Sequence, residues 1–199
     1  SSRPQRPAAV RASAQTLGVA MPNPRRFVQE AHERLVVKQF LSALNTRHRS
    51  SFLVTSEPNP PEAIIQSRQT VRWVEVVTAF WNEAEAKDLY SYATPGERHV
   101  PGNEGLLVNM TPQFSENFAA AVQKKLEKNT YVPFRDFYGP GYLAVSVQFP
   151  FFDRDTLPFM RRAWNSRKVN DLGCFRSVYL IYRVFHGYKV ERWPHRVDA

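Results

Sequence analysis

Residues 61–77, PEAIIQSRQTVRWVEVV, predict a β-hairpin, because two runs rich in Ile and Val flank a short polar turn. Pairing the two runs about that turn sets Ile64 opposite Trp73 and Glu62 directly opposite Glu75. Side chains alternate between the two faces of a strand, so both carboxylates are expected on the face that carries Ile64 and Trp73. That apolar face has to pack against a second layer of structure, which limits the folds open to the chain.

Two glutamates that face each other across a hairpin repel, since directly opposed Cβ atoms lie about 4.5–5.5 Å apart. One carboxyl should then keep its proton, or a cation should lie between the two, which predicts a divalent metal site at Glu62 and Glu75. A register shifted by one residue would instead turn one of these side chains toward solvent.

A third acid is a candidate for the same site. Residues 22–45 predict a helix whose apolar stripe includes Val36 and Phe40, and Glu33 lies on that stripe. A carboxylate on an apolar helix face is destabilising unless it is paired, hydrogen-bonded or bound to a metal. Glu30, one turn earlier, is the alternative candidate, and Glu33 could also reach water where the stripe ends.

Apolar periodicity outlines the rest of the chain as further helices and strands. The other expected helices are 80–93, 112–131 with Ser115 as its N-cap, and 153–167 broken at Pro158. The other expected strands are 51–55, 141–150 and a pair within 175–194 around the His186-Gly187 turn, with 106–110 as a further short candidate. The order predicts an α/β sandwich around a mixed sheet, in a single domain over 23–199 that follows a basic, flexible arm at 1–22.

The net charge of +9 is concentrated at the two ends of the chain. Residues 1–26 contain five arginines and no acid, and residues 161–199 contain nine basic residues against three acidic ones. Basic ends suit a polyanionic partner, nucleic acid before membrane, although a basic surface kept for solubility gives the same pattern. The residues expected to hold phosphates are Arg161, Arg162, Arg167 and Lys168.

A cytoplasmic protein is expected from three features. Cys174 is the single cysteine, which rules out an internal disulfide and suits a reducing compartment. No apolar run approaches the roughly 20 residues that span a bilayer, and the N-terminal stretch has no continuous apolar core typical of a leader.

The helical Glu33, the Pro-Glu pair at 61–62 and the run WVEVV at 73–77 together resemble the PD-(D/E)XK nuclease-like superfamily. Within it, the archaeal Holliday junction resolvases are the nearest in layout, and the resemblance covers roughly residues 24–150. It implies a restriction-endonuclease-like α/β/α sandwich around a central mixed sheet. The family's acidic positions would correspond to Glu33, Glu62 and Glu75.

The sequence departs from the family pattern at two positions. Glu62 stands where the family has Asp, which lengthens one metal ligand by a methylene group and keeps its charge. Val77 stands where the family has the Lys that positions the attacking water. In some members this Lys comes from a neighbouring helix, which makes Lys125 or Lys124 the candidate. Lys125 is favoured, because it lies three and four residues after the apolar stripe positions of its helix.

The resemblance implies a DNA endonuclease that acts on branched or plasmid DNA as a symmetric homodimer. Glu62 and Glu75 would hold Mg²⁺, or Mn²⁺ as a substitute, with Glu33 as a further or water-mediated ligand and Lys125 orienting the nucleophile. Two alternatives stay open: a relative that binds DNA without cutting it, as Val77 suggests, and a protein-interaction module whose basic ends contact an acidic partner.

Overall fold

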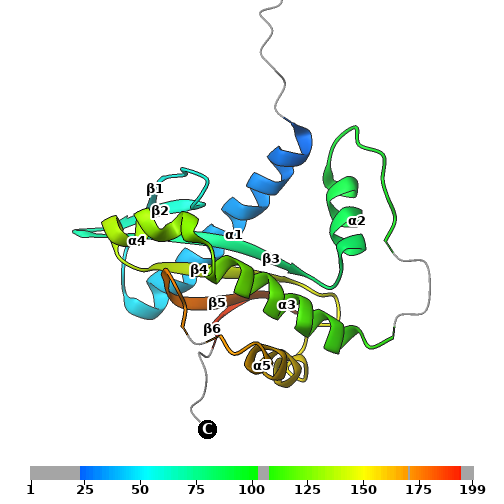
Figure 1. Cartoon of the computed structure of the whole chain (residues 1–199). Helices are drawn as coiled ribbons and strands as arrows, with labels where there is room; N and C mark the ends of the chain where they lie inside the picture. Colours follow the sequence, from blue (N-terminus) through cyan, green and yellow to red (C-terminus); the bar gives the residue numbers. More distant parts are fainter. Residues whose placement is uncertain (1–22, 103–107, 170, 194–199) are drawn as a thin grey trace, which may run out of the picture.

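The computed structural model describes residues 23–102, 108–169 and 171–193. Its centre is a six-stranded sheet in the order β1-β2-β3-β4-β5-β6 (Figure 1). The strands are β1 (Leu53–Ser56), β2 (Ala63–Ser67), β3 (Thr70–Phe80), β4 (Gly141–Gln148), β5 (Phe175–Val184) and β6 (Gly187–Arg192). The helices are α1 (Pro24–His48), α2 (Glu83–Ala93), α3 (Met110–Leu126), the 3-10 turn η1 (Asn129–Tyr131), α4 (Val132–Tyr138) and α5 (Thr156–Ser166).

The sheet is mixed, and its pairing changes twice, from antiparallel to parallel and back. Strands β1, β2 and β3 pair antiparallel, β3, β4 and β5 pair parallel, and β6 returns antiparallel to β5. The parallel pairs are joined by helical connections, as such pairs require. The predicted mixed α/β sandwich is therefore confirmed at this level.

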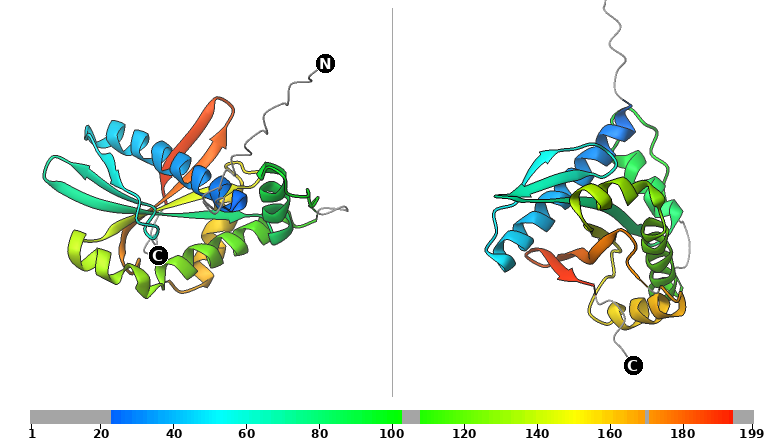
Figure 2. Two further views of the ribbon diagram at one scale, coloured as in Figure 1. Left: turned by 90° about the horizontal axis from the view of Figure 1, so that it is seen from above. Right: turned by 60° about the vertical axis from the view of Figure 1, so that its left-hand side comes forward.

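Helices cover both faces of the sheet (Figure 2). On one face, α1 packs its stripe of Val36, Val37, Phe40, Leu41 and Leu44 onto side chains of β2, β3, β4 and β5. On the other face, α3 and α5 enclose the larger core, which contains Trp73, Phe118 and Leu143. The central strand β4 is buried over nearly its whole length, because both of its faces are covered.

The predicted hairpin register is confirmed. Ile64 pairs with Trp73 and Gln66 pairs with Val71 across β2 and β3. Helix α1 also forms as expected: Asn23 caps it by accepting a hydrogen bond from the Arg25 backbone N–H, and Pro24 occupies the first turn.

Several predicted boundaries are wrong. Strand β3 continues to Phe80, so the helix expected at 80–93 begins only at Glu83, after the Asn82 cap. The N-cap of α3 is Asn109, while Ser115 lies inside the helix and donates to the carbonyl of Thr111. Pro158 does not break α5, because it lies in the first turn, where a missing N–H costs nothing.

Two predicted segments fall wholly or partly outside the described residues. The arm at 1–22 lies outside them. Residues 106 and 107 of the candidate strand at 106–110 also lie outside them, but the rest of that prediction is wrong: Val108 and Asn109 are in no strand, and Met110 begins α3. Among the helices of the described part of the chain, none is long and apolar enough to cross a bilayer.

Candidate active site

Glu75 lies on β3, with neighbouring strands on both sides of it. Its side chain is only 1% exposed, on the face of the sheet that also carries Trp73 and Val77. A carboxylate at this depth needs a compensating group, and Lys125 supplies one: its Nζ forms an ion pair with Glu75 Oε1. The second oxygen, Oε2, is buried and has no hydrogen-bond partner.

Lys125 reaches Glu75 from the last turn of α3. Lys124, the alternative candidate, is exposed on the outer side of the same turn. The ammonium group thus approaches Glu75 from the covering helix α3. Val77, two residues after Glu75 on β3, is buried.

Glu62 immediately precedes β2, so that the antiparallel register brings it level with Glu75 on β3. Its carboxyl shares a hydrogen bond with that of Glu33, which projects from α1. Burial first, and then the negative charges of Glu33 and Glu75, raise the pKa of Glu62 to about 8. At neutral pH Glu62 therefore keeps its proton, and its O–H donates a hydrogen bond to the Glu33 carboxylate.

Glu33 has two further neighbours. Gln29 Nε2 donates to Glu33 Oε1 at 2.9 Å. Burial raises the pKa of Glu33, against the opposing influence of the Gln29 hydrogen bond and the Lys125 charge. The structure thus brings together all four predicted site residues, Glu33, Glu62, Glu75 and Lys125, from α1, the start of β2, β3 and α3.

Tyr131, in η1, is a neighbour of this cluster that was not predicted. Its ring stacks on Trp73 with centroids 5.6 Å apart, and its side chain is almost completely buried. Burial and the nearby charge of Glu75 raise the pKa of the Tyr131 hydroxyl. The one sequence signal for it is its position a few residues beyond Lys125.

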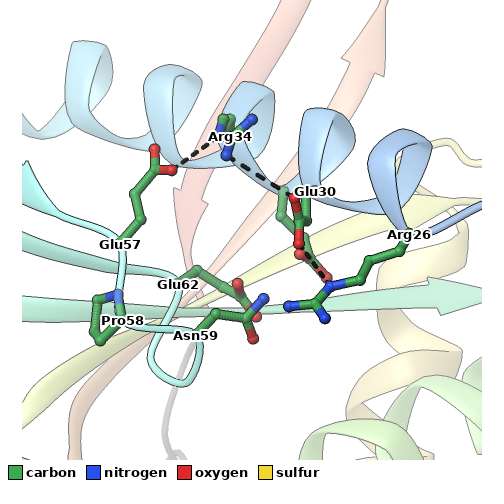
Figure 3. Close-up of a pocket in the computed structure, with 8 residues that line it drawn as sticks. Arg26, Glu30, Arg34, Glu57, Pro58, Asn59 and Glu62 are labelled. Atoms are coloured by element: carbon green, nitrogen blue, oxygen red, sulfur yellow. Dashed lines mark hydrogen bonds and ion pairs between the residues drawn. The ribbon is translucent and has the colours of Figure 1, made fainter. Parts of the chain in front are cut away.

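A pocket of about 190 Å³ opens beside the paired acids Glu33 and Glu62. Figure 3 shows two arginines of α1 at this pocket, each turned toward a glutamate. Arg26 Nε lies 2.8 Å from Glu30 Oε1, and Arg34 Nε lies 2.8 Å from Glu57 Oε2. Glu30, the alternative to Glu33, therefore lines the pocket as the partner of Arg26 and, at 4.0 Å, of Arg34.

The basic residues expected to hold phosphates are not beside this site. Arg161, Arg162, Arg167 and Lys168 belong to α5 or follow it, and Figure 1 shows α5 at the opposite end of the molecule from β1 and β2. Arg167 is occupied by α3, where it donates to Glu116 and Gln123. Arg162 stacks over Phe159 of its own helix, 5.6 Å from the ring centroid. The distribution of charge along the chain does not indicate which basic residues lie beside the acids in the folded protein.

The cluster has carboxylate groups of the kind that bind a cation, but these groups do not surround one common point. Within the described part of the chain, Oε2 of Glu75 has no hydrogen-bond partner, and Glu62 holds a proton that it shares with Glu33. Both observations indicate that the negative charge of the cluster exceeds its positive charge. As the side chains stand, no three His, Cys, Asp or Glu residues of 23–102, 108–169 and 171–193 surround a common point as metal ligands. The donor chemistry, carboxylate oxygens only, suits Mg²⁺ or Mn²⁺.

Comparisons of the chain with family models, with curated proteins and with solved structures give no match. The chemistry open to the site therefore follows from its own geometry: three carboxylates, one ammonium group and a polar pocket lined by two arginines.

Proposed function

We propose that the protein is a divalent-metal-dependent DNA endonuclease with a restriction-endonuclease-like fold, acting on branched or plasmid DNA. The observation that carries this proposal is the meeting of Glu33, Glu62, Glu75 and Lys125, which lie far apart in the sequence. The fold is compatible with this proposal: the antiparallel strands β1, β2 and β3 continue into β4, which is parallel to β3, and helices cover both faces of the sheet.

The charges of the cluster favour a divalent cation. Three carboxylates share one ammonium group, which leaves two negative charges, and a proton on Glu62 neutralises one of them. Glu62, once it has lost that proton, and Oε2 of Glu75 would hold Mg²⁺, with Glu33 as a further or water-mediated ligand. When bound, the cation supplies Lewis acidity that lowers the pKa of water and stabilises charge on the phosphate.

The protein's own groups would do the remaining work. Lys125 Nζ, fixed by its ion pair with Glu75, would hold the attacking water in line through a hydrogen bond. As Glu62 loses its proton, Glu62 and Glu33 would turn from each other toward the cation. The two arginines of the pocket, Arg26 and Arg34, would hold the phosphodiester against the carboxylates.

One observation favours a second candidate, a protein that binds DNA without cutting it. Val77 is buried where the family places its lysine, and Lys125 is already paired with Glu75. If that pair does not open to admit water, the site would hold a cation and DNA but would not hydrolyse the phosphodiester.

The test is cleavage of supercoiled plasmid and of a four-way junction with Mg²⁺, Mn²⁺, Ca²⁺ or EDTA. Wild-type protein is expected to cut with Mg²⁺ or Mn²⁺ alone, and Glu62→Gln and Glu75→Gln are each expected to lower the rate about 100-fold or more. Glu127→Gln, on the exposed end of α3, is the matched control and should cut normally.

A second measurement separates the two candidates. Mg²⁺ should raise the melting temperature of wild-type protein and leave that of Glu62→Gln unchanged. Metal binding without cleavage would favour the non-cutting protein, and cleavage that survives Glu75→Gln would refute the assigned site.

A further inference from the structure

A second cavity continues from the acidic pocket along α1. It has a volume of about 350 Å³ and lies between α1 and the edge strand β1. Arg34, Glu57 and Glu62 line both cavities, so the two form one groove with a polar and an apolar half. The size of the apolar half lies within the range of pockets that hold small organic ligands.

The lining of the apolar half is fixed before any ligand arrives. Its floor is formed by the buried side chains of Val37, Leu41 and Ala63. Its wall includes Phe52, whose backbone is held by Asn45 through two hydrogen bonds: Asn45 Nδ2 donates to the Phe52 carbonyl at 3.0 Å, and the Phe52 N–H donates to Asn45 Oδ1 at 2.8 Å. A wall held in this way can receive a planar group without reorganising.

The charges of the groove indicate what would enter it. Arg34 and Lys38, one turn apart on α1, line the apolar half together with the acids Glu57 and Glu62. The Arg34 guanidinium is bound to Glu57 on an exposed part of the surface, and a phosphate can replace a carboxylate on such a group. A ligand with one planar apolar part and an adjoining phosphate matches both halves of the groove.

We infer that the α1–β1 groove holds the base of an unpaired nucleotide, while the neighbouring phosphate of the same DNA strand lies at Arg34 beside the acids. This inference rests on the proposed function and names its substrate class. A base within a duplex is stacked and paired, so it cannot enter a side pocket without being extruded. The preferred substrates are therefore strands with unpaired nucleotides at the cleavage point, such as single strands, flaps and open junctions.

The experiment measures binding by fluorescence anisotropy in EDTA, where no cleavage occurs. The probes are a labelled single-stranded oligonucleotide, the blunt duplex of the same sequence, and the same single strand with abasic residues. Wild-type protein is expected to bind the normal single strand tightest. Ser42→Trp, which fills the groove from α1, should weaken single-strand binding about tenfold or more and leave duplex and abasic binding unchanged.

Two further variants complete the design. Thr46→Trp, one turn beyond Ser42 and outside the lining of the groove, is the matched control and should bind like wild type. Leu53→Trp fills the groove from β1, where Leu53 is 70% exposed, and should reproduce the loss if Ser42→Trp does not fold.

The result that overturns the inference is distinct from failure of the proposed function. A duplex bound as tightly as the single strand, or filled-groove variants that bind the single strand within twofold of wild type, would refute the groove as a nucleotide site even if the protein cuts DNA. If the wild-type protein does not cut DNA but the filled-groove variants selectively lose single-strand binding, the nucleotide site is supported and the endonuclease activity is refuted.

Discussion

The carboxylate of Glu75 is the most buried charged group of the core, and one neighbouring side chain compensates its charge. Lys125 is 21% exposed along its side chain, so its ammonium group can be solvated on one side while it meets Glu75 on the other. Removing a partner from such a pair costs more than the pair contributes, because it leaves an uncompensated buried charge.

Lys125→Met is therefore expected to lower the free energy of unfolding by about 3 kcal/mol, measured by urea denaturation at neutral pH. Lys124→Met, at the neighbouring exposed position, should change it by no more than about 0.5 kcal/mol. Adding Glu75→Gln to Lys125→Met should recover much of the loss, since no buried charge then remains. Equal effects of the two lysine variants would show that the ion pair does not stabilise the fold.

The three acids of the site could be predicted because each violates its local pattern, whereas Lys125 was a candidate only through the family resemblance. Glu62 and Glu75 interrupt apolar strand runs, Glu33 interrupts an apolar helix stripe, and Lys125 lies beside such a stripe. Tyr131 could not be predicted, because a buried tyrosine after a helix looks like any core aromatic. The arginines of the pocket, Arg26 and Arg34, were also missed, since exposed basic residues on a helix carry no pattern that says what they face.

Strands β3 and β4 are packed closely at the level of Trp73. Gly141 begins β4, and a Cβ atom at this position would overlap the Trp73 indole, whose Nε1 donates to the Gly139 carbonyl at 2.9 Å. The ring is fully buried and stacked on Tyr131, so it cannot move aside cheaply.

Gly141→Ala should lower the free energy of unfolding by about 2 kcal/mol and shift the near-ultraviolet circular dichroism of the aromatic cluster. Gly102→Ala is the control, because its Cβ would meet only the flexible side chain of Asp88, and it should change stability by no more than about 0.5 kcal/mol. A Gly141→Ala protein as stable as wild type would mean that the indole has room to shift.

Elements were predicted well where periodicity alone decides them and poorly where tertiary contacts decide them. The expected helix at 112–131 instead ends at Leu126 and is followed by η1 and α4. A side chain at Gly173 would collide with the Leu126 carbonyl, so a segment distant in the sequence passes against the end of α3. No local pattern contains that contact. The beginning of α2 was misplaced for a similar reason, since pairing with β4 extends β3 to Phe80.

At the scale of the whole molecule, the raised pKa of Glu62 makes stability depend on pH. Its folded value of about 8 lies above the ordinary 4.5, so the folded protein holds a proton that the unfolded chain releases. The resulting stability is fully present below about pH 4.5 and is lost as the pH rises toward about 8. His32, whose pKa is lowered by burial, has the opposite effect below about pH 6.5.

The difference in unfolding free energy between wild type and Glu62→Gln removes the effect of His32, which is common to both, and reports on Glu62 together with its hydrogen-bonded partner Glu33. Relative to the variant, wild-type protein should lose about 2 kcal/mol between about pH 5 and pH 8, a figure reduced for the partial exposure of the carboxyl. Urea denaturation in a pH series measures it. Parallel curves for the two proteins would show that Glu62 titrates normally.

The order of strands in the sheet is the order of strands in the chain. During synthesis, each strand that leaves the ribosome can therefore add to the edge formed by the strand before it, without waiting for a later segment to insert. Glu33, Glu62, Glu75 and Lys125 all precede β4. We expect the nascent chain to carry every acid of the cluster and its lysine before the second half of the sheet exists, while the burial that holds them together comes only with β4 and β5.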